Sequence, residues 1–178
     1  MRKTIHKWFW AWDFDKEEKW INEMAAKGRV LCGIGYATYT FEEGNPGEYV
    51  YRLEMLDKVP TSAESVQYIN FIEDTGAEYI GSLFRWVYFR KRAGAVGFDL
   101  FSDIDSRIKH LDRIIWFAGV LSAANLFSGI NNLFLHSSID MNITVGLLSL
   151  SVGLLLGCGF LKLFFKKSKL KKEKILHE

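Results

Sequence analysis

The sequence contains little cysteine, histidine or proline. Its two cysteines, Cys32 and Cys158, are too few for a disulfide framework, and its four histidines lie in separate segments without the spacing of metal ligands. No nucleophile is accompanied by a recognisable base. We therefore expect no metal site, no cofactor and no enzymatic activity.

The N-terminus lacks the apolar core of a cleavable signal peptide, because charged residues continue to Lys7 and Asp13. We therefore expect membrane insertion to depend on the C-terminal third. Two long apolar runs lie there, at 114–135 and 143–165. The first has no charged residue, and the second has none before Lys162.

A helix needs ~20 apolar residues to cross a bilayer. The residues before the two runs are too few to enclose a pair of helices that are apolar on all sides. The sequence therefore predicts a transmembrane hairpin over 114–165, with the lipid bilayer as its partner and 136–142 as its loop.

Basic residues flank the hairpin at both ends, and the loop has none. The positive-inside rule therefore predicts a two-pass protein of a bacterial cell membrane with both termini in the cytoplasm. The basic tail, 166–178, is expected to be cytosolic and to attract anionic lipid. The flanking residues before the hairpin are Arg85, Arg90, Lys91, Arg92, Arg107, Lys109 and Arg113. Those at its C-terminal end are Lys162, Lys166, Lys167, Lys169, Lys171, Lys172 and Lys174.

Charge is nearly balanced in residues 1–97, with 13 Lys or Arg against 14 Asp or Glu. The basic pI comes mostly from the tail. An RNA-recognition sheet would also carry aromatic residues, but 81–89 lacks the glycine–aromatic spacing of its signature. Nucleic acid is therefore excluded as an expected partner.

The first 97 residues predict an α+β domain. Strands are expected at 5–12, 29–41, 49–55 and 77–92, the last bent at Gly81–Ser82, and Gly33 and Gly35 suggest a bulge. Two helices with signals at both ends are expected, one from Asp15 to Gly28 and one from Thr61 to Gly76. The order βαββαβ predicts a ferredoxin-like domain with both helices on one face of the sheet.

A short linker and an amphipathic helix at 98–113 follow. Ser102 and Asp105 resemble a capping box, and Ile104, Ile108 and Leu111 recur at helical spacing. We expect this helix to continue into the first span. It is either a passive stalk or a coupling between the cytosolic domain and the hairpin.

The run 10–28, from Trp10-Ala11-Trp12-Asp13 to Ala26-Lys27-Gly28, is followed by Tyr49-Val50-Tyr51-Arg52. Over about residues 4 to 120 the chain resembles the domain of unknown function 2812 family of bacterial membrane proteins. The resemblance implies a soluble N-terminal domain before transmembrane segments, often encoded beside a PadR-type repressor. It implies no catalytic residues.

Aromatic and basic residues alternate along the predicted sheet, and contiguous exposed aromatic surface usually marks an interaction site. Such a face could bind a planar or amphipathic ligand, a peptide or a second copy of the chain, or it could pack on the juxtamembrane helix. The acidic residues near Asp13 are interpreted as stabilising the positive end of the helix dipole. The candidate ligand- or partner-binding residues are Trp8, Trp10, Arg52, Trp86, Tyr88 and Arg90.

Within the spans, Gly153 and Gly157 permit close helix approach, and Asn125 places an amide inside the first span. These residues join the helices of one hairpin or mediate a homodimer. The leading functional hypothesis is a membrane-anchored cytosolic sensing or protein-interaction module with a regulatory role. The alternative is a small accessory subunit of a membrane transporter, in which the hairpin binds the partner.

Overall fold

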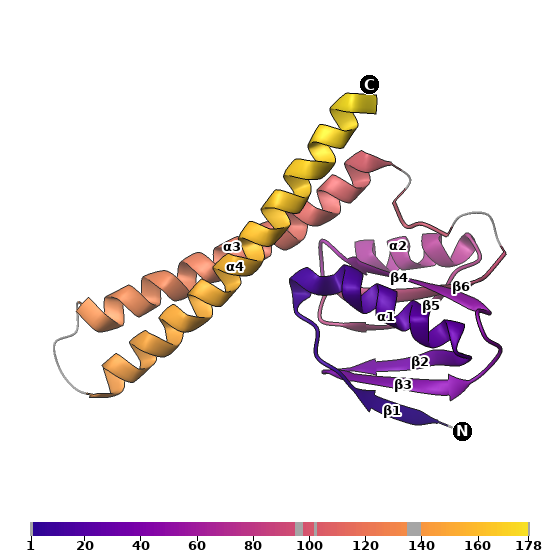
Figure 1. Ribbon diagram of the computed structural model, residues 1–178, viewed down its shortest axis with the longest axis horizontal. Coiled ribbons are helices and arrows are strands. Elements are labelled where there is room, and N and C mark those ends of the chain that lie inside the picture. The colour runs from indigo at the N-terminus through magenta and orange to yellow at the C-terminus, as the bar shows by residue number, and fades with distance from the viewer. Residues whose placement is uncertain (1, 95–97, 102, 135–139, 178) are drawn as a thin grey trace. The chain divides into compact units, whose positions relative to one another are not determined.

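The computed structural model describes residues 2–94, 98–101, 103–134 and 140–177 (Figure 1). The chain divides into two compact units, Met1–Ser102 and Asp103–Glu178. Phe98 and Leu100 pack on the core of the first unit. The predicted linker lies partly outside the described residues, as does Ser102 of the predicted capping box.

The first unit is mixed α and β, as expected. Its helices are α1, Phe14–Ala26, and α2, Ala63–Asp74, and a short 3-10 turn, η1, spans Ala11–Asp13. Its strands are β1, Lys3–His6; β2, Arg29–Gly35; β3, Thr38–Glu43; β4, Tyr49–Met55; β5, Glu78–Leu83; and β6, Trp86–Arg92.

These elements form the same βαββ arrangement twice. The two antiparallel sheets have the orders β1-β3-β2 and β4-β6-β5, so the last strand of each half is central. Both helices end at a glycine in the left-handed region, Gly28 and Gly76, and both following strands have a bulge, before Gly33 and before Gly81. Each pair of equivalent glycines lies 48 residues apart. The unit is therefore a structural duplication.

The ferredoxin-like βαββαβ order is not confirmed, because two turns were missed. The segment 29–41 divides at Tyr36–Ala37, where Ala37 has a φ of 50°. Glycine usually occupies this conformation, because any other residue in it costs ~1–2 kcal/mol. Alanine at this position therefore gives no sequence signal for the turn. Likewise, 77–92 divides at Phe84–Arg85 and not at Gly81–Ser82, and the strand expected at 5–12 already ends at His6.

Helix α1 is bonded to the outer edge of β4. Asn22 donates to the Tyr51 carbonyl oxygen at 3.0 Å and accepts from the Tyr51 amide at 2.9 Å. Glu18 accepts from the Leu53 amide at 2.9 Å. Two side chains of the helix thus satisfy backbone groups that an edge strand otherwise leaves open.

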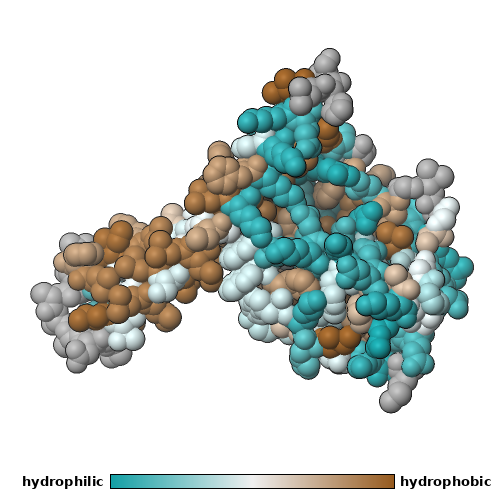
Figure 2. All heavy atoms as spheres, in the orientation of Figure 1, coloured by the Kyte–Doolittle hydropathy of each residue, from teal (hydrophilic) through white to brown (hydrophobic). Residues whose placement is uncertain are grey.

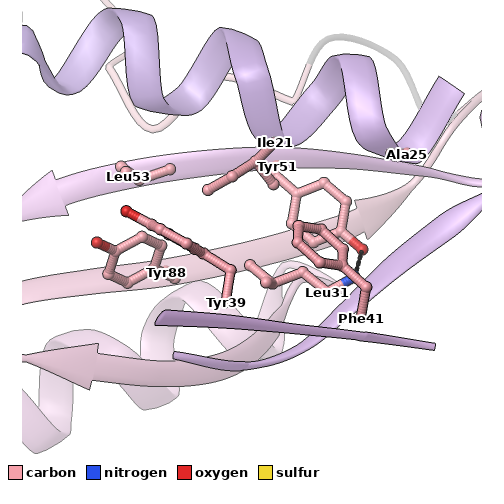
Figure 3. Close-up of a cluster of buried hydrophobic side chains, with 8 residues drawn as sticks. All are labelled: Ile21, Ala25, Leu31, Tyr39, Phe41, Tyr51, Leu53 and Tyr88. Carbon is pink, nitrogen blue, oxygen red and sulfur yellow. Dashed lines mark hydrogen bonds between the residues drawn. The ribbon is translucent and has the colours of Figure 1, made fainter. Parts of the chain in front are cut away.

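The main core lies where α1 meets both sheets (Figure 3). Ile21 and Leu31 are fully buried, and the Tyr51 hydroxyl accepts from the Leu31 amide at 2.9 Å, next to the bulge in β2. A second cluster lies under α2. There Ser62 is the N-cap in place of the expected Thr61. The buried side chains of this second cluster are Leu56, Ile69, Ile72, Ala77, Val87 and Phe89.

The second unit is a pair of long helices, α3, Ile104–Phe134, and α4, Asp140–His177. Both are long and apolar enough to cross a membrane. Helix α3 continues without a break from 104–113 of the predicted amphipathic segment into the first span. It begins at Ile104 and not at residue 98, because Phe98 and Leu100 pack on the core of the first unit. The expected loop lies mostly outside the described residues, and Asp140 already belongs to α4.

Apolar side chains cover the outside of this hairpin. Phe134, Phe127 and Trp116 are 78%, 72% and 69% exposed. On the face shown in Figure 2, the half of the hairpin nearer the interhelical connection is mostly hydrophobic, whereas hydrophilic residues dominate nearer the C-terminus. This pattern fits a two-pass membrane protein.

The basic tail is helical and paired to α3. Lys167 forms an ion pair with Asp112, and Lys174 lies 2.8 Å from Asp105. These acidic residues belong to the amphipathic start of α3. The hairpin therefore continues as an ion-paired helix pair beyond its apolar part.

Close packing between α3 and α4 involves Gly153. A Cβ atom at Gly153 would lie 2.8 Å from the Leu126 Cγ, and Ser122 donates to the Gly153 carbonyl oxygen at 2.8 Å. Gly157 also faces Ser122. Asn125 instead donates to the Leu121 carbonyl oxygen of its own helix.

Replacing Ser122 should weaken the hairpin selectively. Ser122→Ala removes an interhelical hydrogen bond, whose loss costs on average about 0.6 kcal/mol in membrane proteins. Ser151→Ala is the matched control, because Ser151 donates only to the Leu147 carbonyl oxygen of its own helix. Unfolding in mixed micelles should show a loss for the Ser122 variant alone. Equal effects would contradict the assigned packing.

Candidate functional site

Helix α1 carries a carboxylate on its buried face. The buried residues Phe14, Glu17, Ile21 and Ala25 follow one another at spacings of three and four, which makes them one helical stripe. Glu17 is only 9% exposed. Burial of a charged group is costly unless hydrogen bonds compensate for the lost water.

Two tyrosines supply those hydrogen bonds. The Tyr39 hydroxyl donates to the Glu17 Oε1 at 2.7 Å, and the Tyr88 hydroxyl donates to the same oxygen at 2.6 Å. Tyr39 lies on β3 and Tyr88 on β6, the central strands of the two sheets. Figure 3 shows both hydroxyls pointing in the same direction, beside Leu53. One oxygen atom of α1 thus joins the two halves of the unit.

The surroundings of the Glu17 centre, defined as Glu17, Tyr39 and Tyr88, favour protonated groups. Burial raises the pKa of Glu17, and the two tyrosine hydrogen bonds partly oppose this effect. Burial and the neighbouring carboxylate raise the pKa values of Tyr39 and Tyr88. Both hydroxyls therefore remain hydrogen-bond donors at neutral pH.

Half-buried aromatic rings surround this centre. The Trp20 ring lies 5.0 Å from that of Tyr39, and the Phe9 ring lies 6.2 Å from it. Trp86 packs against Phe14, one helical turn before Glu17, with ring centroids 5.4 Å apart. Two further rings therefore pack on Tyr39 of the centre, and a third packs on Phe14 at the start of α1.

The six candidate residues from the sequence fall into separate groups. Trp8 and Trp10 lie after β1, exposed, in edge contact at 5.3 Å. Tyr88 is buried in the Glu17 centre, and Trp86 packs beside Phe14 at its edge.

The two arginines belong to neither group. Arg52 lies 3.3 Å from Glu18 and is paired in register with Phe89, so it faces away from Tyr88. Arg90 is ion-paired with Glu78 at 2.6 Å. The structure thus does not bring the six candidates together on one surface.

Sequence reasoning missed Glu17 and Tyr39 as site residues. It assigned the acidic residues near Asp13 to the helix dipole, whereas Glu17 accepts bonds from two strands. The available signal was position, because Glu17 precedes Ile21 and Ala25 on the apolar stripe. Among the described residues, no three His, Cys, Asp or Glu side chains are grouped as a metal site.

Glu17 should make stability depend on pH. Its pKa is higher in the folded chain than the unfolded value of 4.5, so the folded state binds the proton more tightly. The stabilising contribution of Glu17 is therefore fully present below pH 4.5, and it is lost as the pH rises through the folded pKa. Urea unfolding between about pH 4 and about pH 8 should show this fall. Glu17→Gln should make it smaller but not abolish it, because burial also raises the pKa of Glu18.

Glu23→Gln is the control, because Glu23 lies on the same helix and is 54% exposed. Its pH profile should match that of the unmodified chain. Profiles of the same slope in the chains with and without Glu17 would contradict the burial of an ionisable group at this position.

Comparison with known proteins places most of this structure in one family. Neither curated proteins nor solved structures give a match. The family model described as a protein of unknown function, DUF2812, matches residues 13–122. The match includes the Glu17 centre and the first half of α3, and it begins after Trp8 and Trp10. The chain belongs to the DUF2812 family.

Proposed function

We propose that this protein is a membrane-anchored sensing module whose N-terminal unit binds a small molecule at the Glu17 centre. The observation that carries the proposal is the shared Glu17 Oε1, which accepts from Tyr39 of one sheet and Tyr88 of the other. A ligand that approaches this carboxylate changes the only described hydrogen bonds of the Glu17 side chain. It thereby acts on both halves of the unit.

The chemistry of the centre supports binding better than catalysis. Both tyrosines have raised pKa values and are held as donors, and the carboxylate is already their acceptor. Buried ionisable groups with perturbed pKa values are enriched at functional sites. Aromatic rings beside such a group are typical of ligand pockets.

The second unit supplies the anchor in this proposal. Helices α3 and α4 are long and apolar enough to span a bilayer, and the basic residues at their ends favour cytoplasmic termini. Helix α3 begins at Ile104, two residues after the sensing unit ends, and continues without a break to Phe134. The short connection supports a regulatory role in which a change in the sensing unit reaches the hairpin.

A ligand panel tests this function. The full-length protein in phosphatidylcholine nanodiscs is heated with aromatic compounds that are cationic, neutral or anionic. At least one compound should raise the melting temperature of the protein and of Glu23→Gln but not that of Glu17→Gln, because binding to the folded state stabilises it. If no compound distinguishes the Glu17 variant, the sensing function at this centre is wrong.

A further inference from the structure

We infer that the ligand of the Glu17 centre is an organic cation with an aromatic or apolar body. This inference rests on the proposed function and names the chemical class that the site selects. Three features of the described residues carry it. They are a carboxylate oxygen that accepts no hydrogen bond from the described residues, an ammonium group held by neighbouring rings, and partly buried aromatic rings packed on the same core.

The first feature is the asymmetry of the carboxylate. Both tyrosines donate to Oε1, and no donor from the described residues reaches Oε2. Every fully buried side-chain oxygen or nitrogen in the described part of the chain has a hydrogen-bond partner. Oε2 is therefore not fully buried.

The charge of Glu17 also lacks a protein counterion. None of the basic side chains in the described segments forms an ion pair with Glu17, and its pKa is set by burial and the two tyrosines. By contrast, the neighbouring Glu18 is paired with Arg52. A cation that reaches Oε2 satisfies both the open oxygen and the uncompensated charge.

The second feature is a cation that the protein itself places on these rings. Lys7 Nζ lies 4.5 Å from the Trp20 ring centre and 5.1 Å from that of Phe9. Both rings contact Tyr39 of the Glu17 centre. The aromatic group beside the carboxylate therefore already binds an ammonium through its π faces.

The third feature is the apolar surface for the body of the ligand. Trp20 and Phe9 lie on the Tyr39 side, and Trp86 lies with Phe14 at the start of α1. Trp20, Phe9 and Trp86 are only partly buried, although they pack against the main core. A small hydrated cation gains little from such rings, whereas a bulky aromatic cation contacts both the rings and the carboxylate.

Two ions of the same shape and opposite charge test the ligand class. Tetraphenylphosphonium and tetraphenylborate are each equilibrated by dialysis with the full-length protein in phosphatidylcholine nanodiscs. Glu17→Gln in identical nanodiscs corrects for partition into lipid. The phosphonium should bind the unmodified protein and Glu23→Gln at least about tenfold more tightly than Glu17→Gln. The borate should not distinguish the three proteins.

A second variant tests the same site with Glu17 in place, so its result does not depend on whether Glu17→Gln folds. Lys7 is exposed, and Lys7→Met frees the Trp20 face of its competing ammonium. This variant should bind the phosphonium several-fold more tightly. Equal phosphonium binding by the Lys7, Glu17 and unmodified chains would overturn the inference, and so would Glu17-dependent binding of the borate.

The two proposals fail in different ways. If a neutral or anionic member of the panel stabilises the protein in a Glu17-dependent manner while the phosphonium does not bind, the ligand class is wrong and the sensing function stands. If no compound distinguishes the Glu17 variant, both are wrong.

Discussion

The N-terminal unit depends on how one buried carboxylate is accommodated. Glu17 projects from α1 toward two sheets that belong to separate βαββ halves, and Tyr39 and Tyr88 meet at its Oε1. A carboxylate in this position is costly without donors, and two tyrosine hydroxyls without an acceptor are also costly. The three side chains therefore require one another. Their mutual satisfaction fixes the position of α1 against both central strands, so the same atoms join the two halves of the unit.

The rest of α1 follows from this joint. Asn22 and Glu18 bond to the open edge of β4, and Ile21 fills the space between the sheets. The helix of the first half thus covers the edge strand of the second half. A ligand at Glu17 acts on the element that holds the duplicated halves together, and this gives the sensing proposal its physical basis. The second unit adds two long apolar helices, and Lys174 of α4 forms an ion pair with Asp105 near the start of α3.

Much of this arrangement could be predicted from the sequence, for physical reasons that also explain the failures. The apolar runs and glycine-terminated helices are local signals, so α1, α2 and the pair of long apolar helices could be predicted. The central residues of the turn between β2 and β3 are Tyr36 and Ala37, neither of which is glycine, asparagine or proline. The duplication was therefore hidden, and a ferredoxin-like order was expected instead. Glu17 was misread because an acidic residue near a helix start usually interacts with the helix dipole. Only tertiary structure brings Tyr39 and Tyr88 to it, from positions far apart in the chain.

The most direct test of the shared acceptor is a double-mutant cycle between Tyr39→Phe and Tyr88→Phe. Because both hydroxyls donate to one oxygen, the loss of one changes what the other contributes to the free energy of unfolding. We predict a coupling clearly above the ~0.3–0.5 kcal/mol expected for independent sites, and no coupling when the same cycle is made in Glu17→Gln. Additive losses in the unmodified background would contradict the account, because they would show that the tyrosines do not share the Glu17 carboxylate.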